Sequence, residues 1–197
     1  MSLTAVPVRD PAPMLETALQ EWGGKDDLWV FGYGSLIWRP DFDFVERRDA
    51  KVFGWHRALK MWSRVNRGTP ECPGLVFGML SGGSCRGVIF RVERSRGEDV
   101  MRALWLREMT LGVYDPRWLE CHTSEGPVKS LAFTLSRKSP SHTGLLCDDE
   151  YRRIFSEASG KFGTTFDYAR ATHEQLLQMG IEDRALARLL SLPHKGS

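Results

Sequence analysis

The order of strand-like and helical segments constrains the fold of this chain more than any other feature of its sequence. Strand-like runs occupy much of residues 28–135, with one helical segment among them, and the pattern is helical from Asp148 onward. The regular alternation of strand and helix that a doubly wound parallel sheet requires is absent. We therefore predict an α+β fold with a helical C-terminal part, in which Gly160, Gly163 and Gly180 separate about three helices.

Two pairs of strand-like runs predict β-hairpins. Residues 74–80 and 86–92 flank Ser81-Gly82-Gly83-Ser84, where the glycines can supply the positive φ that a tight turn needs. Residues 117–123 and 128–135 flank a second turn sequence that contains glycine and proline. We expect each pair to fold back on itself.

Other elements follow from local composition and spacing. Residues 28–32 are aromatic and β-branched and end in glycine, which predicts a buried strand, and residues 51–63 predict a longer one. Between the two hairpins, Ser95 and Glu98 have the spacing of a capping box. The helical pattern that follows runs to about Met109.

An amino-terminal arm precedes these elements. Apolar residues recur at helical spacing from Met14 to Trp22, and Gly23-Gly24 ends the pattern, which predicts one short helix. A length of 197 residues favours one domain with a short extension. We therefore divide the chain into the arm (1–26), a single domain (27–192) and a tail (193–197).

Charge and composition exclude several classes of protein. The chain carries 27 Lys and Arg against 25 Asp and Glu, and no basic run reaches five residues, so neither nucleic acid nor a membrane surface is an expected partner. The longest mainly apolar stretch, residues 28–38, is well short of the ~20 residues that span a bilayer. Residues 1–25 carry prolines and charges in place of the apolar centre of a signal peptide. We predict a cytoplasmic protein.

Cysteines and histidines form no metal-binding pattern in the sequence. Cys72, Cys85, Cys121 and Cys147 include no Cys-x-x-Cys pair, and the five histidines show no His-x-x-x-His spacing. We expect reduced thiols, most of them buried, and no metal site.

A loop of small residues, Gly32-Tyr33-Gly34-Ser35-Leu36, directly follows the predicted strand at residues 28–32. Successive backbone N–H groups in such a loop can hold an anion or a developing oxyanion when no side chain blocks the approach. The spacing differs from a dinucleotide-binding loop, a P-loop and a nucleophile elbow. A plain turn between strands also fits these residues.

Helical geometry singles out one carboxylate. Advancing about 100° per residue from Val100 places Glu108 at about 80°, in the middle of an apolar stripe and in the last turn of the helix. Desolvation and the carbonyl end of the helix both raise the pKa of such a group toward the range of a general base. The alternatives are that Glu108 pairs with a buried arginine or turns out to solvent.

The polar loop from Arg64 to Glu71 precedes the first predicted hairpin. Its arginines, Arg67 among them, can bind the carboxylate of a small substrate. A loop whose charges are simply solvated is the alternative interpretation.

Three segments, taken in order, resemble the ChaC-like γ-glutamylcyclotransferases: Val30-Phe31-Gly32-Tyr33-Gly34-Ser35-Leu36-Ile37-Trp38, Arg67-Gly68-Thr69-Pro70-Glu71-Cys72-Pro73-Gly74-Leu75-Val76, and Arg107-Glu108 followed by Gly112 and Tyr114. The resemblance covers about residues 28–190. It implies a compact mixed β-barrel with flanking helices, and an enzyme that degrades glutathione to 5-oxoproline and cysteinylglycine.

The resemblance also implies roles for particular residues. The substrate-binding loop of the family falls on Tyr33, Gly34, Ser35 and Leu36, and its catalytic glutamate falls on Glu108. Further pocket candidates are Arg67, Tyr114 and Tyr168. The segment from Glu108 to Tyr114 is longer than the Glu-Lys-Gly-Gly-Tyr of the short animal forms.

The implied reaction is an intramolecular cyclisation. The α-amine of the γ-glutamyl group must lose a proton before it attacks its own γ-carbonyl, and Glu108 is the expected acceptor, which then protonates the departing nitrogen. Because nucleophile and electrophile share one molecule, no cofactor and no covalent enzyme intermediate are expected. The amides of residues 34–36 would hold the α-carboxylate or the carbonyl oxygen.

Two alternatives to this function are considered. The first keeps the chemistry but acts on other γ-glutamyl amino acids or amines. The second is a non-catalytic binding or regulatory protein, because members of this family were also labelled cation-transport regulators. The sequence indicates neither an oligomeric state nor a purpose for the arm.

Overall fold

The structure of the protein is a computed structural model that describes residues 9–193; the first eight residues of the arm and the last four of the tail lie outside the described residues. Its elements in chain order are α1 (Ala12–Trp22), β1 (Leu28–Gly32), the 3₁₀ turn η1 (Ser35–Ile37), β2 (Glu46–Ser63), β3 (Gly74–Val92), α2 (Arg94–Glu108), β4 (Asp115–Thr123), β5 (Gly126–Thr134), α3 (Asp148–Glu157), β6 (Ser159–Gly160), β7 (Gly163–Thr164), α4 (Thr165–Gln178) and α5 (Arg184–Leu190).

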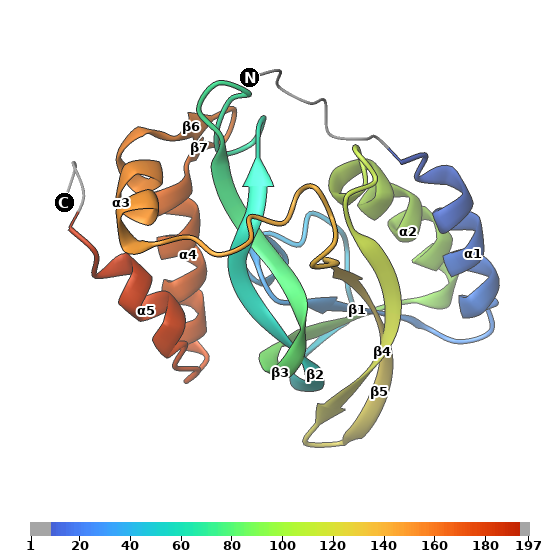
Figure 1. The fold of residues 1–197 in the computed structure, drawn as a ribbon. Helices are drawn as coiled ribbons and strands as arrows, with labels where there is room; N and C mark the ends of the chain where they lie inside the picture. The colour runs from blue at the N-terminus through green and yellow to red at the C-terminus, as the bar shows by residue number, and fades with distance from the viewer. Residues whose placement is uncertain (1–8, 194–197) are drawn as a thin grey trace.

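Five strands close into a barrel in the order β1-β3-β2-β4-β5. Neighbouring strands are antiparallel except β1 and β5, which run parallel and close the barrel where Val30 pairs with Leu131. Helices α1 and α2 lie on one side of the barrel and α3, α4 and α5 on the other (Figure 1). The predicted α+β class, with a compact barrel, flanking helices and a helical C-terminal part, is confirmed.

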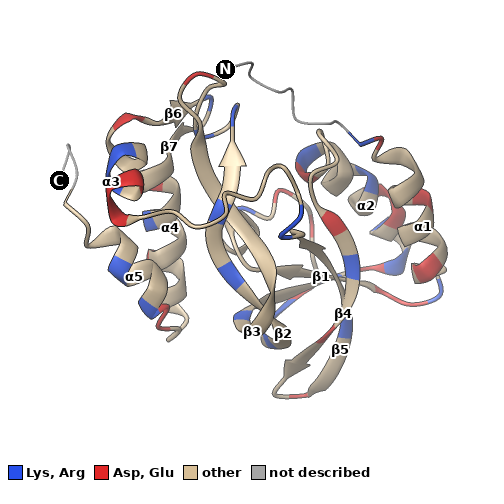
Figure 2. Cartoon of the chain, viewed as in Figure 1, with Lys and Arg blue, Asp and Glu red and all other residues tan. Residues whose placement is uncertain are grey.

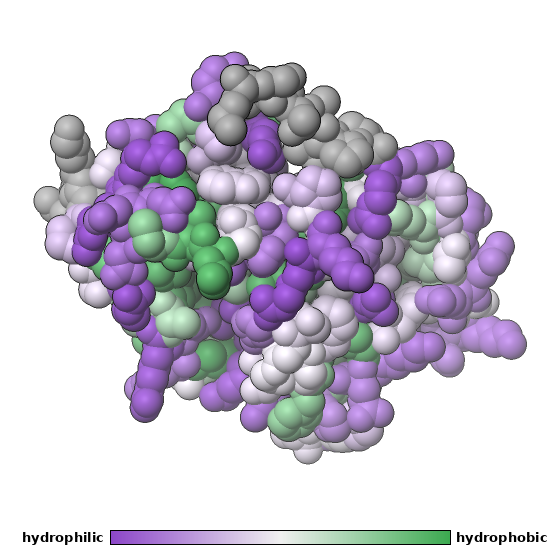
Figure 3. All heavy atoms as spheres, viewed as in Figure 1, coloured by the Kyte–Doolittle hydropathy of each residue, from purple (hydrophilic) through white to green (hydrophobic). Residues whose placement is uncertain are grey.

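Two apolar clusters hold the helices against the barrel. In the first, Met101 and Leu104 of α2 pack with Leu131 of β5. In the second, Tyr168 of α4 packs with Phe77 of β3. Each large apolar side chain that is fully buried contributes about 1.5–3 kcal/mol to stability. The outer face is mostly hydrophilic, with hydrophobic residues gathered between the C-terminal helices and the barrel (Figure 3).

The prediction of a hairpin turn at residues 81–84 is wrong. Strand β3 continues through this segment and pairs with β2 from Gly74 to Arg91. Gly82 and Gly83 do adopt positive φ, 97° and 73°, and the register with β2 shifts at this point of the ladder. The glycines therefore form a bulge that bends two paired strands, because β2 supplies hydrogen-bonding partners on both sides of them.

The start of α2 also differs from the prediction. The helix begins at Arg94, and no side chain of the predicted capping box caps it. Instead, Oδ1 of Asp27 accepts a hydrogen bond from the Arg94 N–H at 2.9 Å, while Glu98 pairs with Arg102 one turn later. A carboxylate distant in sequence thus satisfies the first turn of the helix in place of the local serine.

Other predicted elements are confirmed with small shifts of their ends. Helix α1 ends at Gly23, which has the left-handed φ of 70°. Strands β4 and β5 form the second predicted hairpin, and three helices follow Asp148. Strand β2 begins at Glu46 rather than at Lys51.

The surface charge agrees with the balanced composition. Acidic and basic residues are interspersed on α2 and α3 (Figure 2). Within residues 9–193, none of the helices has both the length and the apolar character needed to cross a membrane.

Candidate functional site

The glycine loop after β1 meets the end of α2 at a small hollow in the protein. This hollow, about 20 Å³ in volume, is lined by Tyr33, Gly34, Ser35, Leu36, Phe77, Glu108, Tyr114, Phe133 and Tyr168. Seven of these nine residues are candidates from the sequence. The barrel strands therefore bring together side chains that lie more than 100 positions apart.

A larger cavity of about 510 Å³ adjoins the hollow. Ser35, Glu108 and Tyr168 line both spaces, so the hollow and the cavity share a wall. Arg67, the remaining candidate from the sequence, lines the larger cavity.

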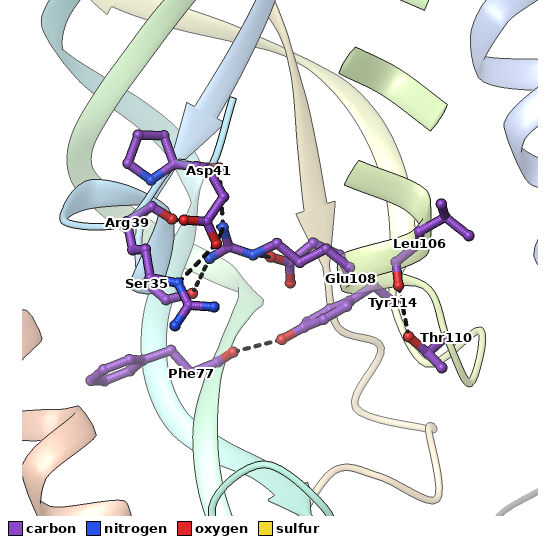
Figure 4. A network of polar contacts seen from close by, with 10 residues as sticks. Ser35, Arg39, Asp41, Phe77, Leu106, Glu108, Thr110 and Tyr114 are labelled. Carbon is purple, nitrogen blue, oxygen red and sulfur yellow. Dashed lines mark hydrogen bonds and ion pairs between the residues drawn. The ribbon is translucent and has the colours of Figure 1, made fainter. Parts of the chain in front are cut away.

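Glu108 is the last residue of α2, and its side chain is 18% exposed. Its Oε1 lies 2.9 Å from Nε of Arg107 (Figure 4), and Glu108 lines the hollow. Burial raises the pKa of this carboxyl above its usual range, and the charge and hydrogen bond of Arg107 offset part of that rise. The pairing with arginine that the sequence left as an alternative does occur, yet the carboxyl group still lines the open space.

Arg107 connects α2 to the segment that follows the glycine loop. Its guanidinium donates to the carbonyl oxygens of Arg39 and Pro40 at 2.7 and 3.0 Å and pairs with Asp41 at 3.0 Å. It also donates to Oγ of Ser35 at 3.1 Å (Figure 4). Arg107 thus fixes the position of the end of α2 relative to the glycine loop.

Three tyrosine hydroxyls converge on the hollow. Tyr33 donates to the carbonyl oxygen of Phe133 at 2.7 Å, and Tyr114 donates to that of Phe77 at 3.1 Å. The Tyr168 hydroxyl accepts from the Phe77 N–H at 3.3 Å. Burial raises the pKa of all three phenols, and the nearby charge of Glu108 adds to the rise. These tyrosines are therefore neutral hydrogen-bonding groups at physiological pH.

The glycine loop offers backbone donors and a close approach. Within residues 9–193, the N–H groups of Gly34, Ser35 and Leu36 have no hydrogen-bond acceptor. A Cβ atom on Gly34 would lie 3.2 Å from the Tyr168 hydroxyl, so glycine keeps this wall of the hollow clear. Such a loop can stabilise a carboxylate or a developing oxyanion.

Positive charge lines the larger cavity. The Arg67 guanidinium lies 5.0 Å from the ring centre of Tyr168 and donates to the carbonyl oxygen of Phe162. Burial lowers the pKa of Arg67 from its usual value. Lys161 also lines this cavity, and within the described residues its ammonium group has no ion pair.

A family profile described as ChaC-like protein matches residues 28–195, most of the chain. The chain belongs to the ChaC-like family. The match begins at the first residue of β1, so helix α1 of this ChaC-like protein lies outside it.

Individual relatives agree with the family assignment. The glutathione-specific gamma-glutamylcyclotransferase of Escherichia coli (strain K12) is 32% identical over 164 residues, which cover 83% of this ChaC-like chain and 71% of that protein. Glutathione-specific gamma-glutamylcyclotransferase 1 of Mus musculus is 32% identical over 172 residues, with 84% and 76% of the two chains covered.

The fold is shared with a solved structure. A gamma-glutamyl cyclotransferase specific to glutathione from yeast superposes with a TM-score of 0.78 at 21% identity, covering 85% of this chain and 96% of that one. The barrel and its flanking helices are therefore the fold of a ChaC-like protein.

Several residues of this ChaC-like site escape sequence reasoning. Arg107 stands beside Glu108 in the sequence, but its helical position differs by about 100°, so periodicity assigns it no part in the site. Lys161 and Phe162 reach the cavity from the turn between β6 and β7, far from the glycine loop in sequence. Within the described residues, no group of three His, Cys, Asp or Glu side chains is placed to hold a metal ion.

Proposed function

We propose that this ChaC-like protein is a γ-glutamylcyclotransferase that converts glutathione to 5-oxoproline and cysteinylglycine. The observation that carries the proposal is that Glu108 and the Tyr33–Leu36 loop line one hollow. A carboxyl group with a raised pKa and unpaired backbone donors thus line the same hollow beside the larger cavity. The names of the relatives from Escherichia coli and mouse supply the choice of glutathione as substrate.

In the proposed reaction, Glu108 accepts a proton from the α-ammonium group of the γ-glutamyl part. The free amine attacks the γ-carbonyl carbon, and a five-membered lactam forms as the amide C–N bond breaks. Glu108 passes this proton to the departing nitrogen. The former α-nitrogen still bears two hydrogens after the attack, and it gives up one of them by the same route, so the lactam forms neutral and cysteinylglycine leaves with its α-amine protonated. Atoms and charges balance without an oxidant, a cofactor or a covalent enzyme intermediate.

The walls of the cavity support the positioning of the substrate. The amides of Gly34, Ser35 and Leu36 supply donors for the α-carboxylate or for the carbonyl oxygen as it gains charge. Tyr33, Tyr114 and Tyr168 enclose the reacting part in a largely apolar wall and keep their protons. Arg67, which lines the larger cavity, supplies positive charge for a substrate carboxylate.

The test is mass spectrometry of the purified protein incubated with glutathione. We expect 5-oxoproline from the parent protein and a loss of about 10²- to 10⁴-fold in kcat for Glu108→Gln, which keeps the shape of the side chain but cannot accept the proton. Glu98→Gln is the matched control, since Glu98 is an exposed glutamate of the same helix. Parental turnover by Glu108→Gln would refute the assignment of the base.

Substrate range is tested in the same assay. We expect a higher rate with glutathione than with γ-glutamyl-alanine; the reverse order would assign the same chemistry to other γ-glutamyl compounds. No 5-oxoproline from either compound, together with a stable protein complex in a pull-down, would favour the regulatory alternative.

We also propose that residues 27–192 form the single catalytic domain and that the protein works in the cytoplasm, without nucleic acid or membrane as a partner. Cys72, Cys85, Cys121 and Cys147 are free thiols, which supports a reducing compartment.

A further inference from the structure

The segment that follows Glu108 forms a wall beside the site. A cavity of about 140 Å³ lies against it, and the residues of this part of the chain that line the cavity are Glu108, Thr110, Leu111, Val113 and Tyr114. Tyr114 also reaches the hollow itself. The backbone path of residues 109–114 therefore fixes one side of the space around the proposed base.

One arginine of the amino-terminal arm holds this segment. Arg9 donates through Nε to the carbonyl oxygen of Gly112 at 2.6 Å and through a terminal nitrogen to that of Tyr114 at 2.7 Å. Its other terminal nitrogen pairs with Oδ1 of Asp115 at 2.7 Å. All five N–H groups of a guanidinium lie in one plane, which suits it to join three acceptors on a single stretch of chain.

The backbones of the arm and the segment also approach closely. Gly112 has a left-handed φ of 60°, and a Cβ atom at this position would lie 2.3 Å from the carbonyl oxygen of Arg9. Glycine is therefore required at position 112 both for its conformation and for the contact with the arm.

The arm is itself anchored on the helix that carries Glu108. Nε1 of Trp105 donates to the carbonyl oxygen of Pro11 at 3.0 Å. The Trp22 ring packs against Gly97 of α2, where an added Cβ atom would be 2.4 Å from the ring. Arg9 is thus held in a fixed place relative to α2. Its hydrogen bonds to Gly112 and Tyr114 in turn fix the position of the segment after the helix.

We propose that Arg9 is a positioning residue for the reaction, acting through the carbonyl groups of Gly112 and Tyr114. The inference rests on the proposed function. It assigns a purpose to the arm, whose helix lies outside the family match, and it explains how the segment between Glu108 and Tyr114 is kept in one conformation.

The experiment compares Arg9→Ala and Arg9→Lys with the parent in steady-state kinetics on glutathione. We expect kcat to fall about 10- to 100-fold in Arg9→Ala, since small displacements of catalytic groups have effects of this size. KM should change less than threefold. Arg9→Lys should recover only part of the loss, because an ammonium group cannot bond both carbonyls in the same plane.

Two controls separate this role from a general effect of charge. Arg152→Ala removes an exposed arginine from α3 that pairs with Asp149, and it should leave kcat unchanged. Asp115→Asn removes only the charge of the partly exposed ion partner of Arg9, and it should cost less than threefold in kcat.

Hydrogen exchange at the amides of residues 110–115 gives a readout that does not depend on activity. We expect faster exchange there in Arg9→Ala, with exchange in the barrel strands unchanged. Parental kcat together with parental exchange would overturn the proposal, as would an equal loss of kcat in Arg152→Ala. If the parent releases no 5-oxoproline, the proposed function fails, and unchanged exchange would then refute the role of Arg9 separately.

Discussion

Nε of Arg107 lies 2.9 Å from Oε1 of Glu108, which places a permanent positive charge against the carboxyl group that we propose as the base. The same guanidinium pairs with Asp41 at 3.0 Å. Burial raises the pKa of Glu108, Arg107 lowers it, and Asp41 raises it. The protonation of the base is therefore set by its burial together with charged neighbours of both signs, Arg107 and Arg39 on one side and Asp41 on the other.

Substitution of these neighbours should move the acid limb of the pH profile in opposite directions. Arg107→Gln removes the group that lowers the Glu108 pKa, so the limb of kcat/KM should shift to higher pH. Asp41→Asn removes a group that raises it, so the limb should shift to lower pH. Asparagine also tolerates the positive φ of 57° at position 41. Shifts in the same direction would show that Glu108 does not govern this limb.

Replacement of Glu108 should stabilise the fold at high pH. Because its pKa is higher in the folded protein than in the unfolded chain, the folded state binds the proton more tightly, and stability falls as pH rises between the two values. At pH 8, Glu108→Gln should be more stable than the parent by on the order of 1 kcal/mol in urea unfolding. The gain should disappear near pH 4, where the carboxyl group is protonated in both states. A less stable variant at pH 8 would contradict the burial argument.

Gly34→Ala should lower activity by crowding the hollow. The added Cβ would lie 3.2 Å from the Tyr168 hydroxyl. We expect a loss of about tenfold in kcat/KM. Tyr168→Phe removes the crowded hydroxyl, so the alanine should cost less in that background. Strictly additive effects in this double-mutant cycle would show that the two groups do not meet.

The buried ion pair between Arg57 and Asp183 should contribute strongly to stability. Their side chains are 5% and 16% exposed, and Arg57 also donates to the carbonyl oxygen of Tyr33 at 3.0 Å. Asp183→Ser keeps an oxygen to cap α5 but leaves the guanidinium unpaired, which should cost about 3–5 kcal/mol in urea unfolding. Arg188→Ala breaks an exposed pair and should cost about 1 kcal/mol or less. Equal losses would mean that burial does not strengthen the Arg57 pair.

Local sequence patterns predicted the parts of this protein that short-range geometry controls. Helical spacing alone placed Glu108 among Val100, Met101, Leu104 and Trp105, and all four neighbours are buried in the structure. The glycine loop was predicted from the apolar strand at residues 28–32 and the small residues that directly follow it. These predictions depend on neighbours within a few residues, for which the backbone period is fixed.

Local patterns failed where a distant segment supplied the partner. Gly82 and Gly83 have the positive φ of a turn, but whether they reverse the chain or bend it depends on β2, which lies beside them throughout. In the same way, Ser95 was a suitable cap for α2, and Asp27 took that place. The residue type determines which backbone conformations a position can adopt. The contacts with segments distant in sequence then determine which of these conformations the folded protein uses.

The sequence by itself determined the α+β class, the glycine loop and the single carboxylate on an apolar helix face. Only the tertiary structure decided that Arg107 pairs with Glu108 beside the glycine loop and that three tyrosines line the hollow. It also decided that Arg9 donates hydrogen bonds to the segment that follows Glu108. The physical reason is that periodicity and turn chemistry act over a few residues. Closure of the barrel, by contrast, fixes distances between groups that are a hundred positions apart, and no local preference encodes those distances.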